Sequence, residues 1–153
     1  MTKTQNWKKG FTLIELLIVV AIIGVLATLL MANFVGVRQR ARDAQRKSDI
    51  RQIQAALEIF RSDSSSYPLN GSGPGKFPQT GSCKQSLQSQ DGSSTYMTSI
   101  SCDPNGGSNV YTYTSDGTTY TLTACLENAS DSQVDSPKNG ICTTPASFTV
   151  KNP

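Results

Sequence analysis

An uninterrupted apolar run near the N-terminus constrains this chain more than any other feature. The run covers residues 11–34, and a helix of that length reaches ~36 Å, enough to cross the hydrocarbon core of a bilayer. Glu15 is the one ionisable residue within it. A charged side chain at the centre of a membrane helix costs about 2.5–3.5 kcal/mol, so such a residue indicates a functional site. We therefore expect a membrane-spanning helix in which Glu15 has a partner.

The residues around this acid form a recognisable motif. Lys8, Lys9 and Gly10 precede Phe11, and Glu15 follows four positions later at the start of the apolar run. Over roughly residues 1–60 the chain resembles the type IV pilins and the pseudopilins of type II secretion systems. The resemblance implies that a prepilin peptidase cleaves between Gly10 and Phe11 and methylates the new amine of Phe11. It also implies that Glu15 pairs with the terminal amine of a neighbouring subunit.

Physical chemistry agrees with these roles. Gly10 has no side chain, so a protease can hold the backbone closely around the bond that it cuts. The Phe11 amine and the Glu15 carboxylate form a charge-assisted pair, and removing one partner of a buried pair costs ~3–5 kcal/mol. Contacts of this head-to-tail kind generate open filaments. The alternative is an ordinary signal anchor that tolerates one Glu.

Beyond the apolar run the helix is expected to continue as an amphipathic segment. Ile50, Ile53, Leu57 and Phe60 recur at spacings of three and four, which predicts one buried stripe. A Ser-rich stretch followed by Tyr67 and Pro68 then ends the helix. We expect a leader at 1–10, a long helix at 11–61 with its membrane and assembly part at 11–34 and an amphipathic part at 35–61, and a globular head at 62–153.

The strongest β-strand pattern lies in the second half of the head. Residues 110–114 and 118–126 alternate around the turn formed by Asp116 and Gly117, and 147–150 is a further candidate strand. A short helix is expected around 94–100 and a turn at 103–107. The predicted fold class is α+β: a long helix whose C-terminal half packs on a small antiparallel sheet, which gives a lollipop-shaped subunit.

Four cysteines, Cys83, Cys102, Cys125 and Cys142, lie in the head. In an exported chain an even number of cysteines indicates disulfides, and three pairings are possible. We favour Cys83 with Cys102 and Cys125 with Cys142, because the second bridge would clip the loop 127–141 to the sheet. It would close a loop similar to the C-terminal disulfide-bounded region of many pilins. A zinc site is the rival, but no CxxC spacing is present.

The loop 127–141 also holds weak calcium candidates. Major pseudopilins, which the chain resembles, bind calcium in a loop near this part of the head, and Asp131 and Asp135 are oxygen donors of the required kind. The simpler interpretation is that both carboxylates are solvated, and the prediction is a chain without a cofactor.

The basic residues of 38–51 have three interpretations. They form a solvated helix face, they contact anionic lipid before assembly and the acidic heads of neighbouring subunits afterwards, or they bind DNA. Three Lys before the apolar run and six Lys or Arg in 38–51 would favour a cytoplasmic head by the positive-inside rule. The family resemblance implies the opposite orientation, with the leader in the cytoplasm, and we follow the resemblance.

No catalytic constellation is visible. The chain has no His, which excludes His-based acid–base and nucleophilic catalysis. The predicted function is that of a structural subunit of a type IV pilus-like filament for adhesion, motility or DNA uptake, built from copies of itself with a separate assembly platform and ATPase. One alternative is a major pseudopilin that forms a short periplasmic piston for type II secretion. The other is a minor or competence pilin that binds DNA. The expected location is the inner membrane, with one span and the head outside, then an extracellular pilus or a periplasmic pseudopilus.

Overall fold

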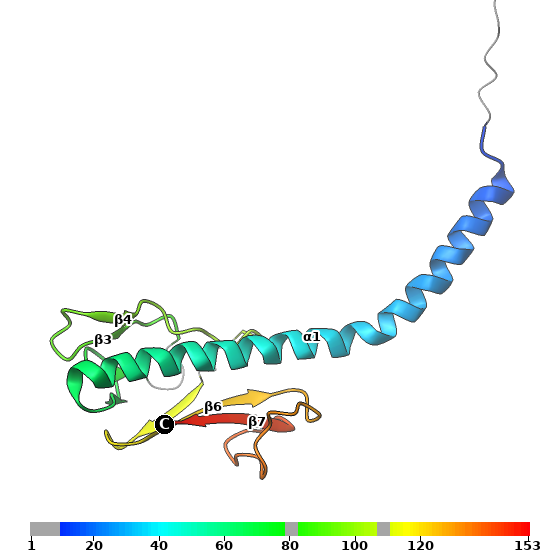
Figure 1. The fold of residues 1–153 in the computed structure, drawn as a ribbon. Helices are drawn as coiled ribbons and strands as arrows, with labels where there is room; N and C mark the ends of the chain where they lie inside the picture. The colour runs from blue at the N-terminus through cyan, green and yellow to red at the C-terminus, as the bar shows by residue number, and fades with distance from the viewer. Residues whose placement is uncertain (1–9, 79–82, 107–110) are drawn as a thin grey trace, which may run out of the picture. The chain divides into compact units, whose positions relative to one another are not determined.

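The computed structural model describes residues 10–78, 83–106 and 111–153, apart from the side chains of residues 32 and 33. Its two compact units, Met1–Arg38 and Gln39–Pro153, are considered separately. Within the described residues the regular elements are one helix and seven strands (Figure 1). They are α1 (Leu13–Ser64), β1 (Leu69–Asn70), β2 (Lys76–Phe77), β3 (Leu87–Gln88), β4 (Thr95–Met97), β5 (Thr112–Ser115), β6 (Tyr120–Leu126) and β7 (Ala146–Lys151).

The first unit consists of the N-terminal part of α1. Leu13–Met31 is long and apolar enough to cross a membrane, with a mean hydropathy of 2.9, and none of it is buried. Apolar side chains surround the helix on all sides, as is typical of a helix that contacts lipid or other helices on every face. The helix begins two residues after the expected start at Phe11.

The second unit is organised around the C-terminal part of α1. The predicted buried stripe is confirmed, since Ile50, Ile53, Leu57 and Phe60 are all fully buried. Strands β3 and β4 lie on one side of the helix, and β6 and β7 lie on the other (Figure 1). The helix therefore occupies the middle of the hydrophobic core of this unit.

The sheet has the strand order β5-β6-β7, with both pairs antiparallel, and it confirms the α+β fold class. Alternate residues of β6 face the core, and these are Tyr120, Leu122, Ala124 and Leu126. The turn predicted at Asp116 and Gly117 joins β5 to β6. Gly117 has a φ of +88°, and the Asp116 carboxylate accepts the N–H groups of Thr118 and Thr119. Val110, the expected start of β5, lies outside the described residues.

The prediction of a short helix at 94–100 is wrong. Thr95–Met97 forms β4, which pairs antiparallel with β3, because the extended chain brings the Tyr96 ring edge-on to Phe60 at 5.3 Å between centroids. Seven residues are too few for a helix that is stable without such packing. The turn at 103–106 is confirmed by a hydrogen bond from the Gly106 N–H to the Asp103 carbonyl, and Gly107 lies outside the described residues.

Candidate assembly site and ionic cluster

The cleavage site predicted between Gly10 and Phe11 lies just before α1. Both residues are exposed and neither is helical. Apart from the chain neighbours of Gly10, no described atom lies within 4 Å of the position that a Cβ on this residue would occupy. A peptide bond outside the helix and open to solvent is accessible to a protease. The leader cations Lys3, Lys8 and Lys9 lie outside the described residues, and cleavage and methylation remain predictions.

Glu15 forms a hydrogen-bonded cap with Thr12. The backbone N–H and the hydroxyl group of Thr12 each donate to Glu15 Oε2 at 2.8 Å, and the Glu15 N–H donates to Thr12 Oγ1 at 3.3 Å. This reciprocal arrangement is a capping box, which satisfies N–H groups at the start of a helix. The Thr-x-x-Glu spacing of residues 12 and 15 is the sequence signature of this cap. The carboxylate is therefore held in a fixed position, exposed to whatever approaches the start of α1.

The apolar side chains that follow Glu15 have no cover within the described chain. Leu16 is 61% exposed, Leu17 57% and Leu30 69%. A contiguous apolar surface of this extent marks a site of contact with lipid or with another protein. The segment that carries Glu15 is therefore built for surroundings that a single folded chain does not supply.

A buried ionic cluster fixes α1 to the rest of the second unit. Arg46, which is 2% exposed, donates two hydrogen bonds to Asp103, at 2.7 Å from Nε and 2.9 Å from Nη2. Its Nη1 lies 2.6 Å from Asp43 and 2.8 Å from Glu127. Burial works against the charged guanidinium, but hydrogen bonds to three carboxylates outweigh it and raise the pKa of Arg46. One side chain thus joins α1, the 103–106 turn and the end of β6.

The carboxylates of the cluster are also fixed by other groups. The Asp43 carboxylate, 1% exposed, accepts the backbone N–H groups of Glu127 and Asn128. Glu127 accepts two hydrogen bonds from Arg42. The Arg42 guanidinium, and then Arg46, lower the pKa of Glu127 to about 2 against the opposing effect of burial. The Tyr111 hydroxyl group donates a hydrogen bond to Asp49 Oδ2, with 2.6 Å between the two oxygens. Burial, and then the Asp49 carboxylate, raise the pKa of Tyr111.

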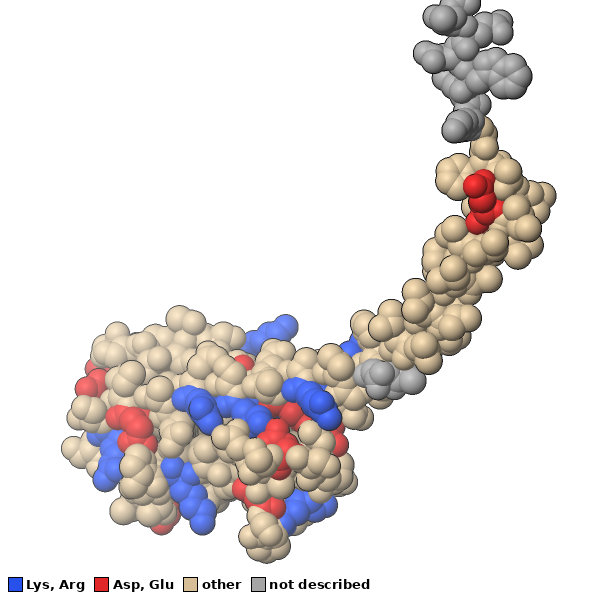
Figure 2. Space-filling view, turned by 45° about the vertical axis from the view of Figure 1, so that its right-hand side comes forward, with Lys and Arg blue, Asp and Glu red and all other residues tan. Residues whose placement is uncertain are grey.

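The interpretation of residues 38–51 as a solvated basic face is wrong for three of its cations. Arg42, Arg46 and Lys47 form ion pairs with carboxylates of the same unit, and Lys47 Nζ lies 2.6 Å from Asp131. Figure 2 shows blue and red side chains interleaved along this part of the surface. Sequence reasoning missed the cluster because three of its acids, Asp103, Glu127 and Asp131, lie 57 to 85 residues away from the basic residues that they contact. The pairing neutralises three of the six cations in 38–51 and so reduces the free positive charge that DNA binding would require.

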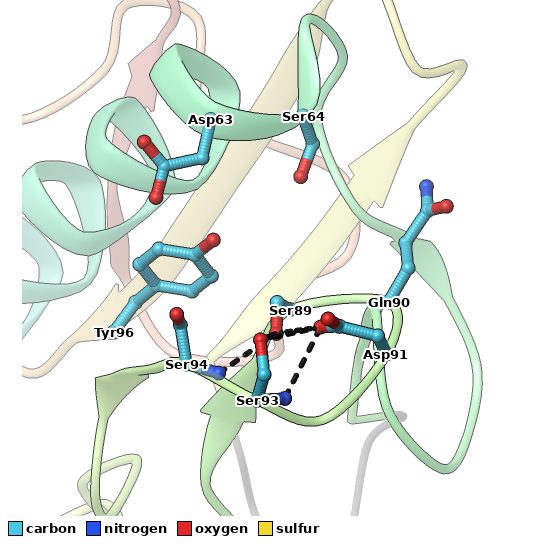
Figure 3. A pocket seen from close by; sticks show the side chains of 8 residues that line it. All are labelled: Asp63, Ser64, Ser89, Gln90, Asp91, Ser93, Ser94 and Tyr96. Atoms are coloured by element: carbon cyan, nitrogen blue, oxygen red, sulfur yellow. Dashed lines mark hydrogen bonds between the residues drawn. The ribbon is translucent and has the colours of Figure 1, made fainter.

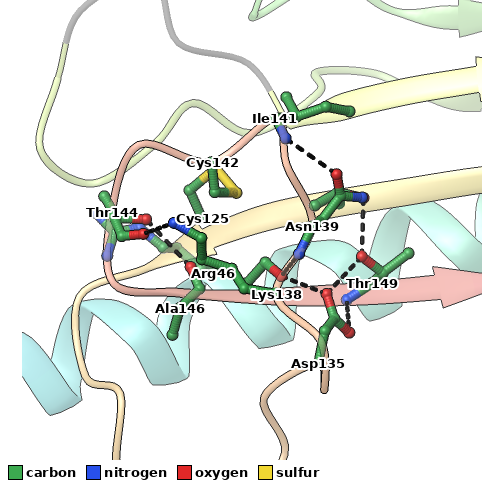
Figure 4. The surroundings of a disulfide bond; sticks show 12 residues. Arg46, Cys125, Asp135, Lys138, Asn139, Ile141, Cys142, Thr144, Ala146 and Thr149 are labelled. Carbon is green, nitrogen blue, oxygen red and sulfur yellow. Dashed lines mark hydrogen bonds between the residues drawn. A yellow bond between two sulfur atoms is a disulfide. The ribbon is translucent and has the colours of Figure 1, made fainter.

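Asp131 and Asp135, the weak calcium candidates, have separate protein partners. Asp131 pairs with Lys47, whereas Asp135 accepts hydrogen bonds from Ser147, and from both the N–H and the hydroxyl group of Thr149 (Figure 4). Across the ranges that the structure describes, no group of three or more acidic, His or Cys side chains is placed to hold a metal ion. Asp135 instead attaches the loop 127–141 to β7.

Both disulfides join the cysteines favoured from the sequence. Cys83 is bonded to Cys102, and Cys125 is bonded to Cys142. The second bridge connects β6 to the far end of the 127–141 loop (Figure 4), and Asn139 closes the space between them by donating to Thr123 Oγ1 at 3.2 Å. Thr123 is consequently buried although it lies on the outer face of β6. The loop is thus held by a covalent bond, by ion pairs to α1 and by hydrogen bonds to the sheet.

A polar hollow of about 370 Å³ lies at the C-terminal end of α1 (Figure 3). Asp63 and Ser64 of α1 line one side, and residues of the β3–β4 hairpin line the other. The Asp91 carboxylate accepts hydrogen bonds from Ser89 Oγ and from the N–H and hydroxyl group of Ser93, which lower its pKa to about 2. Neither the Asp63 nor the Asp91 carboxylate has an ion-pair partner among the described residues.

Comparison with known proteins identifies the family. Residues 8–31 match the prokaryotic N-terminal methylation motif, and residues 33–138 match the family of type II secretion system protein G. The type II secretion system core protein G of Dickeya chrysanthemi is 29% identical over 126 residues, which cover 74% of this chain and 81% of that protein. The corresponding protein of Pseudomonas aeruginosa is 33% identical over 116 residues, covering 74% and 78%. That of Escherichia coli K12 is 35% identical over 71 residues, which span about half of each chain (46% and 49%).

No solved structure gives a significant match. The matches correct the order of the functional predictions: a filament subunit is the right class, but the secretion pseudopilin, given above as an alternative, is better supported than a pilus subunit. The apolar helix, the capped Glu15 and the small sheet packed on α1 agree with that class of protein. The chain therefore belongs to the type II secretion system protein G family, the pseudopilins.

Proposed function

We propose that this chain is the major structural subunit of a type II secretion pseudopilus. It is inserted in the inner membrane with its leader in the cytoplasm, cleaved between Gly10 and Phe11, methylated on the Phe11 amine, and polymerised into a short periplasmic filament. The observation that carries this proposal is the match to the protein G family over residues 33–138, directly after a methylation motif. In these terms the chain has three parts: a leader at 1–10, a long helical part at 11–61 in which α1 begins at Leu13, and a globular head at 62–153.

The exposed start of α1 supports polymerisation through this segment. Glu15 is held by Thr12 with its carboxylate accessible, and the apolar side chains beyond it are uncovered. When the same segments of other copies surround them, these side chains leave lipid for a packed helical core. The Phe11 amine of a neighbouring copy then supplies the opposite charge that Glu15 needs in apolar surroundings.

The two disulfides support a periplasmic location of the globular unit. Disulfides form and persist in oxidising compartments, and all four cysteines are paired in this unit. Polymerisation then takes place on the periplasmic side of the membrane, whereas nucleotide is present on the cytoplasmic side. Since the sequence has no P-loop, a separate ATPase and a membrane assembly platform supply the energy, and a prepilin peptidase supplies the processing.

Replacing Glu15 tests the proposal. Glu15→Ala is expected to insert in the membrane normally and to reduce the filament fraction severely, measured by sedimentation of material released from cells that produce the whole secretion system. Leu17→Ala is the comparison variant: it shortens a side chain of the same packed segment without removing a charge, and it should reduce the yield much less than Glu15→Ala does. A normal filament yield from Glu15→Ala would contradict the pairing mechanism.

Mass spectrometry of the assembled subunit tests the processing step. We expect a mature N-terminus at methylated Phe11, and an assembled subunit that still begins with Met1 would contradict cleavage. Electron microscopy decides between the two filament types: short fibres confined to the periplasm support the secretion pseudopilus, and long surface fibres support the pilus. No observation on the described residues favours DNA binding as a second function.

A further inference from the structure

One side of α1 in the second unit has no partner among the described residues. Its side chains, called here the outward stripe, are all exposed and recur at helical spacing: Arg40, Ala44, Ser48, Arg51, Ala55 and Ile59. Arg40 and Arg51 are eleven residues apart, about three turns, so they lie on the same side of the helix. Ile59 is 54% exposed, which is unusual for a large apolar side chain in a unit whose other helical isoleucines are fully buried.

The two arginines of the outward stripe differ from the basic residues next to them. Arg42, Arg46 and Lys47 are neutralised by carboxylates of the same unit. No carboxylate of the described residues lies within 4 Å of Arg40 or Arg51. These two cations are therefore available to a partner.

The end of the second unit at which α1 ends carries negative charge, opposite in sign to the outward stripe. Asp63 in the last turn of α1 and Asp91 in the β3–β4 hairpin lie across the polar hollow from each other (Figure 3). Gln90 lines both this hollow and a neighbouring one that includes Asp116, so three exposed carboxylates gather at this end. The carbonyl groups at the C-terminus of α1 add partial negative charge, which attracts cations.

Two cations at this end do not cancel that charge. Arg61 donates to the Tyr67 hydroxyl group at 3.0 Å and lies over the Tyr67 ring. Lys76 lines the neighbouring hollow and is the one cation among the described residues that line the two hollows. Negative charge therefore exceeds positive charge where α1 ends.

We propose that the outward stripe binds a second copy of this chain, with Arg40 and Arg51 facing the carboxylates of Asp63 and Asp91 in that copy. The inference rests on the proposed function, since it describes how copies contact one another in the filament. Along the helix axis Arg51 precedes Asp63 by ~18 Å and Arg40 precedes it by ~35 Å. Copies stacked in parallel with offsets of this size bring one arginine beside one carboxylate, so the charges help to set the axial register.

A second copy fits this surface better than an unrelated partner for two reasons. Both halves of the complementary charge pattern belong to the same chain, one at each end of the same stretch of helix. The outward stripe also lies on the helix that carries the apolar assembly segment nearer its N-terminus, and its small side chains Ala44, Ser48 and Ala55 allow another chain to approach closely. Contact through the stripe would also cover Ile59.

Charge reversal tests the contact. Asp63→Arg with Asp91→Arg is expected to lower the filament yield by about fivefold or more, because the attraction between the arginines of one copy and this end of the next becomes repulsion. Adding Arg40→Asp and Arg51→Asp to the same chain should restore the yield to within about twofold of the wild type. Lys151→Glu, which changes an exposed cation on β7, is the matched control. An unchanged yield from the Asp63 and Asp91 variant, or a failure of the fourfold variant to recover while its globular unit remains folded by circular dichroism, would overturn the inference.

Site-specific cross-linking in the full-length protein gives a second test that does not require filaments. A photoreactive residue at position 51 should yield cross-linked dimers whose partner peptide, identified by mass spectrometry, contains the end of α1 or the 89–94 hairpin. Dimers linked elsewhere, or no dimers, would overturn the inference. If the wild type forms filaments and these results fail, the proposed function stands and only this contact is wrong. If the wild type forms none, the proposed function itself fails.

Discussion

The two compact units of this chain place their apolar and charged residues in opposite ways. Residues of the first unit expose large apolar side chains all around α1, and the one carboxylate, Glu15, is satisfied by a neighbour three positions away. The second unit buries its apolar stripe under a sheet and a hairpin. Its buried Arg46 and Asp43 pair with each other and also with residues 57 to 85 positions away. The same helix runs through both units, so helix formation alone does not distinguish them.

The difference shows which surroundings each unit is built for. The first unit lacks any partner within the described chain for its apolar surface, and its contacts come from lipid or from other copies. The second unit supplies its own cover and its own counter-ions. A substitution that acts on the folding of one unit is therefore expected to leave the other unchanged, and three predictions test this separation, from the largest expected effect to the smallest.

Arg46→Met should give the largest loss of stability. The substitution leaves the buried carboxylate of Asp43 and the partly buried carboxylate of Asp103 without a cation, and loss of one partner costs ~3–5 kcal/mol in comparable buried pairs. Chemical unfolding of the full-length protein in detergent, followed by near-ultraviolet circular dichroism of its tyrosines, measures the change. Arg51→Met is the matched control on the same helix, with an expected change within about 0.5 kcal/mol. Equal losses of unfolding free energy for both variants would show that the ionic cluster does not stabilise the second unit.

Acid should weaken the second unit in a defined pH range. The pKa of Glu127 is about 2 in the folded protein, below ~4.3 in an unfolded chain. A lowered folded-state pKa stabilises the fold above the unfolded-state value, and that stabilisation is lost as the pH falls toward the folded-state value. The Arg46 side chain, against the effect of burial, lowers the pKa of Asp103 as well. The free energy of unfolding should therefore be constant above about pH 5 and fall between about 4.5 and 2.

Glu127→Gln removes one of the groups that titrate in this range. The variant should be less stable than the wild type at neutral pH and should lose less stability on acidification. The measurement is a series of unfolding curves at fixed ionic strength. If both proteins show the same slope between about pH 4.5 and 2, Glu127 is not the group responsible.

Thr12→Ala should have the smallest effect on stability, confined to the first unit. Loss of a helix N-cap of this kind costs ~1 kcal/mol, and here it frees the first turn of α1. Amide hydrogen exchange in detergent micelles should quicken at residues 13–16, whereas unfolding of the second unit stays unchanged. Thr12→Ser keeps the hydroxyl group and should behave like the wild type. Protection at 13–16 that survives in Thr12→Ala would show that the cap is unimportant.

Patterns that depend on neighbours in the sequence were predicted well. The buried stripe from Ile50 to Phe60, the hairpin turn at Gly117 and the two antiparallel strands that it joins follow from periodicity and turn chemistry. The helix expected at 94–100 failed because packing of Tyr96 on Phe60, a tertiary contact, outweighs a weak local preference in so short a segment. The capping role of Thr12 was readable from the Thr-x-x-Glu spacing but was overlooked.

The sequence by itself determined that residues 11–34 form an apolar helix with a single acid near its start, and that a small sheet follows. It did so because helix length, hydropathy and turn formation depend on residues a few positions apart. Only the tertiary structure decided which charges of 38–51 are neutralised within the fold and which remain available. Arg46 meets Asp103 and Glu127 only after the chain has folded back along α1, and no local pattern encodes that meeting. Arg40 and Arg51 have the same charge, but the fold leaves them facing outward, because no acidic segment returns to that side of the helix among the described residues.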